Sequence, residues 1–321
     1  MKIFTDSRCQ EHVSPQGYPE RRARLEGILV KLGSSDWEIQ EESPQPSAAE
    51  AVSRLHDERY LERFRRAVER GDGILDSADN PLSQGTWSGA WGAAEAAVAA
   101  AEWVQEASGR KAFVAVRPPG HHAERSTAMG FCFLNNAAVA AEHLRARHGL
   151  SRVAIFDFDI HHGNGTQHLF EERSDVLYAS THQFPFYPGT GARQEVGRGE
   201  GEGSTVNVPL PAGTGDEPFR AAVEEEILPA LERFRPELLI ASAGFDAWKG
   251  DPLGGFRLEL ETFRWLGRRL AAFAELHCDG RLLSVLEGGY DLRRLPDLVV
   301  AYLKGQGEGP ADATDPLLKR G

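Results

Sequence analysis

Short apolar runs without alternation recur along the chain, and each stops at a polar or glycine-rich stretch. A run that is apolar at consecutive positions is typical of a strand buried on both faces of a parallel sheet, because helices cover both sides of such a sheet. A first strand is expected within Met1–Asp6, where Ile3 and Phe4 lie between polar residues. The other predicted strands are Ala112–Val116, Val153–Phe158, Val176–Ser180, Leu238–Ala243 and Leu282–Leu286.

Longer segments between these runs are predicted to be helices. Alternation of strand and helix predicts an α/β architecture with right-handed crossover connections. Neither an internal repeat nor a linker divides the 321 residues, so we expect one domain. The last stretch, Gly305–Gly321, is rich in Gly, Asp and Pro and is predicted to fray. The predicted helices are Gly89–Ala107, Asn136–His148, Phe219–Phe234 and Leu260–Leu276.

Composition narrows the class of protein. The chain has 48 acidic and 36 basic residues and a formal net charge of −12, which argues against a nucleic-acid binder because such proteins neutralise phosphates. Three cysteines, Cys9, Cys132 and Cys278, lie far apart and offer neither a disulfide framework nor a cysteine zinc cluster. The most apolar window, Ala93–Val104, is interrupted by two glutamates and is too short to span a bilayer. With no segment of secretory type at the start, we expect a cytoplasmic protein.

Polar or glycine-rich segments, with side chains that can bind a ligand or take part in a reaction, directly follow five of the predicted strands. The carboxyl ends of parallel strands meet at one edge of a sheet, where sites form. We therefore expect these segments to form a single site at the carboxyl edge of the sheet. They are Arg117–His122, Asp157–Gly165, Ser180–His182, Gly244–Asp246 and Glu287–Tyr290.

Asp159, His161 and Asp246 form a predicted metal site. Asp159 and His161 alternate, so in a strand they would point to the same side, and Asp246 would add a third ligand from another strand end. Three protein ligands leave zinc a position for water, which is the catalytic arrangement. Iron(II) or cobalt could occupy the same ligand set.

The adjacent His121 and His122 are the acid–base candidates. They follow two prolines and a glycine, which stiffen the loop and let its backbone come close to a ligand. One imidazole beside the metal could take a proton from water and deliver it to a leaving amine. Asp157 and Asn164 are available to orient the rings.

Tyr290 follows two glycines and could donate its hydroxyl to a developing oxyanion. Phe131 and Tyr187 are loop aromatics expected near the same site, where they would suit an aliphatic substrate stem. Four other histidines fall in helical or surface contexts, where their ring nitrogens are expected to be hydrogen-bonded within the protein or solvated. They are His56, His143, His148 and His277.

Taken together, these segments closely resemble the arginase-like deacetylase superfamily of histone deacetylases, acetoin-utilisation proteins and acetylpolyamine amidohydrolases. The matching stretches run from Tyr18-Pro19-Glu20-Arg21 to Tyr290. Asn164, in place of the Asp of class I enzymes, and the segment Gly250–Gly254 look most like the class II branch. The motifs that carry the resemblance are Arg117–His122, Gly130–Cys132, Asp157–Gly163 and Glu287–Tyr290.

The resemblance implies a fold and two kinds of cation. The fold is a single three-layer αβα domain over residues 1–304 with a mainly parallel, roughly eight-stranded sheet, followed by a tail at 305–321. One catalytic zinc ion would bind to the three predicted ligands. Structural potassium would be held by backbone carbonyls around Asp157, Asp159, His161 and Ser180.

The resemblance also implies roles for the remaining site residues. His122 would be the principal general acid–base, with His121, paired to Asp157, as its electrostatic partner. Tyr290 would polarise the acyl carbonyl. Phe131 and Tyr187 would flank a tunnel for the acyl amine, and Gly130 would line it. Arg21 would lie near the inner end of this tunnel. Leu253 is on the loop where some polyamine-selective relatives carry an acidic residue. Tyr187 stands where better-known members carry Phe, which bears on the width of the tunnel.

The predicted function is zinc-dependent hydrolysis of an N-acyl amide to acetate and a primary amine. Acetyl-lysine in proteins or peptides is slightly favoured as substrate, with acetylated small amines such as acetylpolyamines close behind. One alternative is a binuclear manganese ureohydrolase of the arginase type, which needs a second Asp where this chain has Gly163. The other is a non-catalytic acyl-lysine binder, which is disfavoured because the ligands and the tyrosine are all present.

Overall fold

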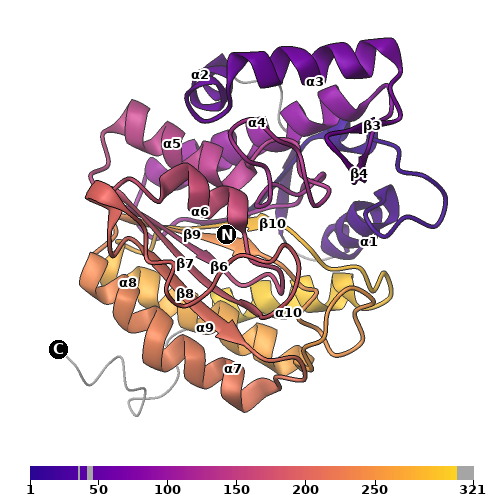
Figure 1. Ribbon diagram of the computed structural model, residues 1–321. Helices are drawn as coiled ribbons and strands as arrows, with labels where there is room; N and C mark the ends of the chain where they lie inside the picture. The colour runs from indigo at the N-terminus through magenta and orange to yellow at the C-terminus, as the bar shows by residue number, and fades with distance from the viewer. Residues whose placement is uncertain (35–36, 42–45, 309–321) are drawn as a thin grey trace.

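The computed structural model describes residues 1–34, 37–41 and 46–308 (Figure 1). Its centre is an eight-stranded sheet in the order β2-β1-β5-β10-β9-β6-β7-β8, and every neighbouring pair of strands is parallel. A separate antiparallel pair joins β3 (Ile74–Leu75) to β4 (Ser77–Pro81). The sheet strands are β1 (Lys2–Thr5), β2 (Glu38–Glu41), β5 (Lys111–Val114), β6 (Val153–Asp157), β7 (Val176–Gln183), β8 (Thr205–Leu210), β9 (Leu238–Ala243) and β10 (Leu282–Leu286).

The six strands predicted from apolar runs are all present. Strands β9 and β10 have the predicted bounds, and β7 extends further, to Gln183. Every residue of β6, β7, β9 and β10 is buried, as expected for the middle of a sheet that is covered on both faces. The two strands of the eight-stranded sheet that were not predicted, β2 and β8, lie at its edges, where half-exposed positions need no apolar run.

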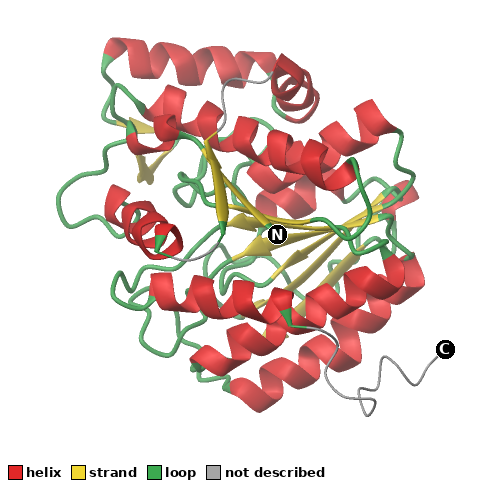
Figure 2. Ribbon diagram, turned by 180° about the vertical axis from the view of Figure 1, so that it is seen from behind, coloured by secondary structure: helices red, strands yellow, loops and turns green. Residues whose placement is uncertain are grey.

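Helices cover both faces of the sheet in three layers (Figures 1 and 2). Helices α2 to α6 lie on one face, and α7 to α10 lie on the other with α1 packed against α10. The helices are α1 (Arg22–Gly33), α2 (Pro46–Leu55), α3 (Glu58–Arg70), α4 (Thr86–Gln105), α5 (Asn136–His148), α6 (Asn164–Phe170), α7 (Asp216–Ala222), α8 (Leu228–Phe234), α9 (Leu260–His277) and α10 (Leu295–Gly307).

Local signals explain where some helices begin and end. Helix α5 has the predicted bounds because the Asn135 side chain accepts a hydrogen bond from the Ala138 amide at its start and Gly149 takes a left-handed conformation after its end. The predicted helix Phe219–Phe234 is instead α7 and α8 joined by a π-helical turn at Val223–Ile227. Helix α4 is alanine-rich and buried along most of its length, which lets it pack closely against both the sheet and the neighbouring helix α5.

The domain continues beyond the predicted boundary at residue 304. Helix α10 runs to Gly307, and the buried Gln306 donates a hydrogen bond from Nε2 to Ser284 Oγ at 3.0 Å. The expectation that the chain frays from Gly305 is therefore wrong for residues 305–308, because this last turn packs against α9. The rest of the predicted tail, residues 309–321, lies outside the described residues. Within the described part of the chain, the helices are too short or too polar to cross a membrane.

Candidate active site

Asp159 and His161 come together in the turn that follows β6. The strand ends at Asp157, so the two residues do not alternate within a strand as predicted. Instead, hydrogen bonds hold the turn: the Asp159 amide donates to Asp157 Oδ1 at 3.1 Å, and the His161 amide donates to Asp159 Oδ1 at 2.9 Å. The side chains still meet, because both the amide and Nδ1 of His161 contact Asp159 Oδ1.

Asp246, which follows β9, completes a buried group of three possible metal ligands. His161 Nδ1 lies 3.0 Å from Asp159 Oδ1 and 3.2 Å from Asp246 Oδ2. Asp246 Oδ1 accepts a hydrogen bond from the Ile160 amide, whereas the buried Oδ2 has no hydrogen-bond partner among the described residues beyond its contact with His161. Burial lowers the pKa of His161, but the two carboxylates outweigh it and raise the pKa to about 10, so this corner attracts positive charge. Two carboxylates, one imidazole and an unpaired buried oxygen fit a divalent cation.

Two glycines make room for these carboxylates. A Cβ on Gly288 would lie 2.1 Å from Asp246 Oδ2, and a Cβ on Gly244 would lie 2.3 Å from Asp159 Oδ2. The Gly288 amide also donates to Asp159 Oδ2 at 2.8 Å. The glycines after β9 and β10 are therefore required by close approach of backbone to the carboxylates.

The two adjacent histidines have different partners. His121 Nδ1 lies 3.0 Å from Asp157 Oδ2, and His122 Nδ1 lies 2.7 Å from Asn164 Oδ1. The Asn164 amide nitrogen contacts Glu124 Oε1 at 2.5 Å, which assigns its oxygen to His122. His122 Nδ1 therefore carries the hydrogen, and its Nε2 is left as a proton acceptor.

The charges around the two rings drive their pKa values apart. Burial favours a neutral His121, but the charges of Asp157 and Asp159 outweigh burial and raise its pKa to about 10. For His122, burial together with the positive charges of His121 and His161 lowers the pKa well below its usual value. The pair thus consists of a charged and a neutral imidazole whose ring centroids are 4.0 Å apart.

Tyr290 is held in place from two sides. Its amide donates to Asp251 Oδ2 at 2.6 Å, and the guanidinium of Arg24 lies 4.7 Å from the centre of its ring. Arg24 also donates to the carbonyls of Gly289 at 2.7 Å and Glu287 at 2.5 Å, so it fixes the loop that carries the tyrosine.

The expectation for Arg21 is wrong. Arg21 precedes α1, is exposed, and lines a surface hollow together with Arg293; Tyr290 borders both this hollow and the active-site cavity. The buried arginine behind Tyr290 is Arg24, one helical turn further on, because α1 begins at Arg22 and its buried face starts at Arg24 and Leu25.

A cavity of about 300 Å³ leads to this group of residues. Four of the predicted substrate-binding residues, Gly130, Phe131, Tyr187 and Leu253, line it. His122, His161 and Tyr290 line it as well. The sequence analysis did not assign two further lining residues, Asp79 and Phe186.

These two additional residues belong to the walls of the cavity. The Phe186 ring stacks on His161 with centroids 5.3 Å apart. Asp79, in β4, accepts hydrogen bonds at Oδ2 from the Tyr187 hydroxyl at 2.9 Å and from the Gly130 amide at 3.1 Å. Consecutive aromatics could have indicated Phe186, but no local signal marks Asp79, which only the antiparallel β3–β4 pair brings to the cavity.

Gly163 occupies the position at which an arginase-type site needs a second carboxylate. A Cβ at Gly163 would lie 2.3 Å from Asp157 Oδ2, so the space for a side chain is already filled. Asp157 instead faces His121. The Gly163 position therefore has no room for a second carboxylate.

Comparison with known proteins identifies the family of this chain. A model of the histone deacetylase domain matches residues 18–305. The chain is 40% identical over 294 residues to a probable deacetylase of Archaeoglobus fulgidus, covering 90% of this chain and 81% of the relative. It is 40% identical over 302 residues to a histone deacetylase-like amidohydrolase of Pseudomonas aeruginosa, covering 93% and 78%. The chain belongs to the histone deacetylase family.

A solved structure agrees with this assignment. The acetylpolyamine aminohydrolase of Burkholderia pseudomallei superposes with a TM-score of 0.87 at 32% identity, covering 96% of this chain and 98% of that one. This member of the histone deacetylase family is thus a hydrolase of amide bonds, with activity of the deacetylase or acetylpolyamine amidohydrolase type.

Proposed function

We propose that this family member is a zinc-dependent deacetylase that hydrolyses the acetyl amide of an N-acetylated amine. One observation carries the proposal: His161, His122 and Tyr290 line the same cavity, at whose base Asp159 and Asp246 gather. A zinc ion held by Asp159, His161 and Asp246 would supply Lewis-acid polarisation of the acyl carbonyl and lower the pKa of a water molecule.

The protein groups then account for the proton transfers. His122 Nε2 takes a proton from the attacking water, because Asn164 keeps the hydrogen on Nδ1. The water oxygen bonds to the acyl carbon while the Tyr290 hydroxyl donates to the carbonyl oxygen. The C–N bond then breaks as the proton passes from His122 to the amine nitrogen, leaving acetate and a primary amine. His121, paired to Asp157, stabilises the site electrostatically.

The cavity walls support a substrate with an aliphatic stem and a nearby N–H or cationic group. Phe131, Phe186 and Tyr187 provide aromatic walls for the stem. Leu253 leaves its loop without an acidic side chain, but Asp79 supplies a carboxylate to the cavity wall. A carboxylate can pair with the amide N–H of a peptide or with the ammonium group of a polyamine. Acetyl-lysine in a peptide or protein and an acetylpolyamine are both compatible with this wall.

A kinetic comparison tests the proposal. The zinc-loaded protein is assayed with an acetyl-lysine peptide, acetylputrescine, acetylspermidine and longer acyl-lysines, and we expect deacetylation of at least one acetylated amine. Asp246→Ala should abolish turnover, whereas Asp72→Ala, which removes only a surface partner of Arg70, should not. Absence of deacylation throughout the panel would refute the proposal, as would full activity of zinc-free Asp246→Ala.

We also propose a structural potassium ion near backbone carbonyls around Asp157, Asp159, His161 and Ser180. Support comes from the strand register: Asp157 and Ser180 are partners across β6 and β7, so the backbone segments that would supply these carbonyls lie side by side. Replacing potassium by sodium at constant ionic strength should then change the melting temperature. An unchanged melting temperature would contradict the potassium site.

A further inference from the structure

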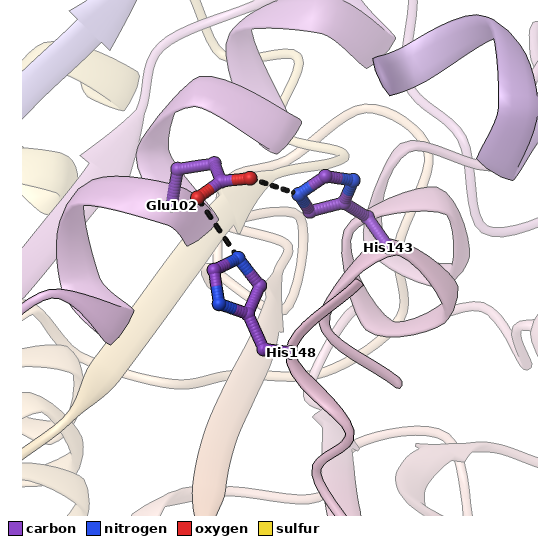
Figure 3. A group of neighbouring side chains, drawn as sticks. All are labelled: Glu102, His143 and His148. Atoms are coloured by element: carbon purple, nitrogen blue, oxygen red, sulfur yellow. Dashed lines mark hydrogen bonds and ion pairs between the residues drawn. The ribbon is translucent and has the colours of Figure 1, made fainter. Parts of the chain in front are cut away.

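A second group of possible metal ligands lies outside the active site. Glu102 of α4 meets His143 and His148 of α5, and one ligand atom from each residue lies within 4.8 Å of the others (Figure 3). In the described part of the chain, this is the one such group besides Asp159, His161 and Asp246. The sequence analysis expected both histidines to be hydrogen-bonded within the protein or solvated.

The three side chains point toward one another. His143 Nε2 lies 2.5 Å from Glu102 Oε1, and His148 Nε2 lies 2.8 Å from Oε2, so each ring faces its own carboxylate oxygen (Figure 3). The side chain of His143 is 2% exposed, whereas those of Glu102 and His148 are 34% and 27% exposed. The group therefore has a fixed, buried imidazole and an open side that faces solvent.

These separations can widen into a ligand set. Zinc holds nitrogen and oxygen ligands at about 2.0–2.1 Å, which places two tetrahedral ligands about 3.3 Å apart, so the two contacts would have to open by roughly 0.5–0.8 Å. His148 is the last residue of α5 and is partly exposed, which leaves it free to make this adjustment. Each imidazole must present an unprotonated Nε2 to a metal, which a neutral ring achieves by carrying its hydrogen on Nδ1.

The position in the fold favours a cation and separates this group from catalysis. Glu102 is in the last turn of α4 and His148 ends α5, and helix C-termini carry partial negative charge. The two helices lead into β5 and β6 of the parallel sheet, so their C-terminal ends lie at the edge where those strands begin. The active site is at the opposite edge, where the strands end.

We propose that Glu102, His143 and His148 bind a divalent transition-metal ion of the zinc class, which ties α4 to α5. Two imidazoles and one carboxylate suit zinc and its neighbours, whereas calcium and magnesium prefer oxygen ligands. The ion is structural in role, since the α4–α5 contact that it joins is remote from the catalytic edge. A chain that binds zinc at both sites holds two ions, neither bridged to the other.

Zinc counting on the full chain tests the site. After incubation with zinc and removal of the excess, elemental analysis should give about two zinc ions per chain for the unaltered protein and about one for Glu102→Gln or His148→Gln. The matched control is His277→Gln, because His277 is likewise the last residue of its helix but stacks on Phe273. Deacetylase turnover should stay within about twofold in all three variants, since none of these residues lines the cavity.

A second measurement separates a metal site from a hydrogen-bonded cluster. In Asp246→Ala, zinc should still raise the melting temperature, and adding His148→Gln should remove that increase. Equal zinc content and equal zinc-induced melting shifts with and without His148 would overturn the proposal. In that case Glu102 would join the two helices by hydrogen bonds alone.

Discussion

At the scale of single residues, neighbours decide what each functional group can do. His121 and His122 are adjacent in sequence, yet one contacts a carboxylate and the other an amide oxygen. Burial and the charges of His121 and His161 keep His122 neutral, and its contact with Asn164 leaves Nε2 without the hydrogen. The charges of Asp157 and Asp159 keep His121 protonated. The chemistry of the pair therefore depends on Asp157 and Asn164, which arrive from β6 and α6.

The Tyr290 hydroxyl is expected to matter mainly in the transition state. Tyr290→Phe should lower kcat by about 10²–10³-fold, the usual effect of removing one oxyanion donor, and leave KM within a few-fold. Steady-state kinetics on the best substrate of the panel measure both constants. Tyr18→Phe serves as control, because Tyr18 packs against Phe131 from 5.4 Å away. A loss in kcat below tenfold, or an equal loss in the control, would contradict the role of the hydroxyl.

His56 is expected to make stability depend on pH. Its Nδ1 donates to the Glu124 carbonyl and its Nε2 accepts from the Asn135 amide, so the buried ring is satisfied only when neutral. Burial lowers its pKa to about 4. Between this value and the ordinary pKa of about 6.5, the unfolded chain binds the proton and the folded chain does not. The contribution of the neutral His56 ring to the free energy of unfolding is complete above pH 6.5 and is lost as the pH falls toward 4.

Nuclear magnetic resonance can follow the His56 ring directly. Its titration should be absent between pH 8 and 5 in the folded protein, whereas in the unfolded chain the same ring should titrate near the ordinary pKa of about 6.5. Titration of His56 near pH 6.5 in the folded state would contradict the burial argument.

At the scale of elements, the loop after the His121–His122 turn forms one wall of the cavity by adopting unusual backbone angles. Gly130 and Phe131 both have positive φ, +56° and +70°. The amide of Phe131 donates to Asn80 Oδ1 at 2.8 Å, so β4 supports this conformation from outside. The antiparallel β3–β4 pair therefore shapes the entrance, although it is not part of the main sheet.

Gly130→Ala should damage the site more than the fold. A Cβ at this position would lie 2.2 Å from His122 Cδ2, so the ring must move. We expect kcat/KM to fall by at least 10²-fold, because small displacements of catalytic groups cost about that much. The control is Gly17→Ala, where φ is +79° but no heavy atom lies within 4 Å of the new Cβ. Comparable activity of the two variants would show that the clash is relieved without moving His122.

At the scale of the whole molecule, buried charges join the start of the chain to the carboxyl ends of the strands. Both oxygens of Glu20 accept from the Arg117 guanidinium, at 2.8 Å and 2.5 Å, and Arg24 lies 3.3 Å from the same carboxylate. Arg24 continues to the loop that carries Tyr290. One network therefore connects α1, the end of β5 and the end of β10.

Removal of the Glu20 charge should destabilise the molecule strongly. Glu20→Gln leaves buried guanidinium charge without its partner, and such a loss typically costs about 3–5 kcal/mol in the free energy of unfolding. Urea unfolding followed by circular dichroism measures the change. Glu50→Gln, which affects an exposed pair with Arg54, should leave the same free energy almost unchanged, because solvent screens such a pair. If the two variants were equally stable, the buried network would contribute no more than a surface pair.

Much of the architecture follows from local sequence. Consecutive apolar residues predict β9 and β10 with their observed bounds, because a strand covered on both faces needs apolar side chains at every position. Asn135 and Gly149 delimit α5 for equally local reasons. The candidate site residues that follow the strands can also be predicted from the sequence, since parallel strands present their carboxyl ends at one edge of the sheet.

The tertiary structure decided what depends on contacts between distant segments. Edge strands β2 and β8 lack an apolar run, so only their pairing reveals them. Arg21 was expected near the inner end of the tunnel, but Arg24 is the arginine buried behind Tyr290, because the first residue of α1 sets which side chains face inward. Asp79 reaches the cavity through the β3–β4 pair, and Glu102 meets two histidines only because α4 packs on α5. Local periodicity determines which elements form, whereas long-range packing determines which polar atoms become neighbours.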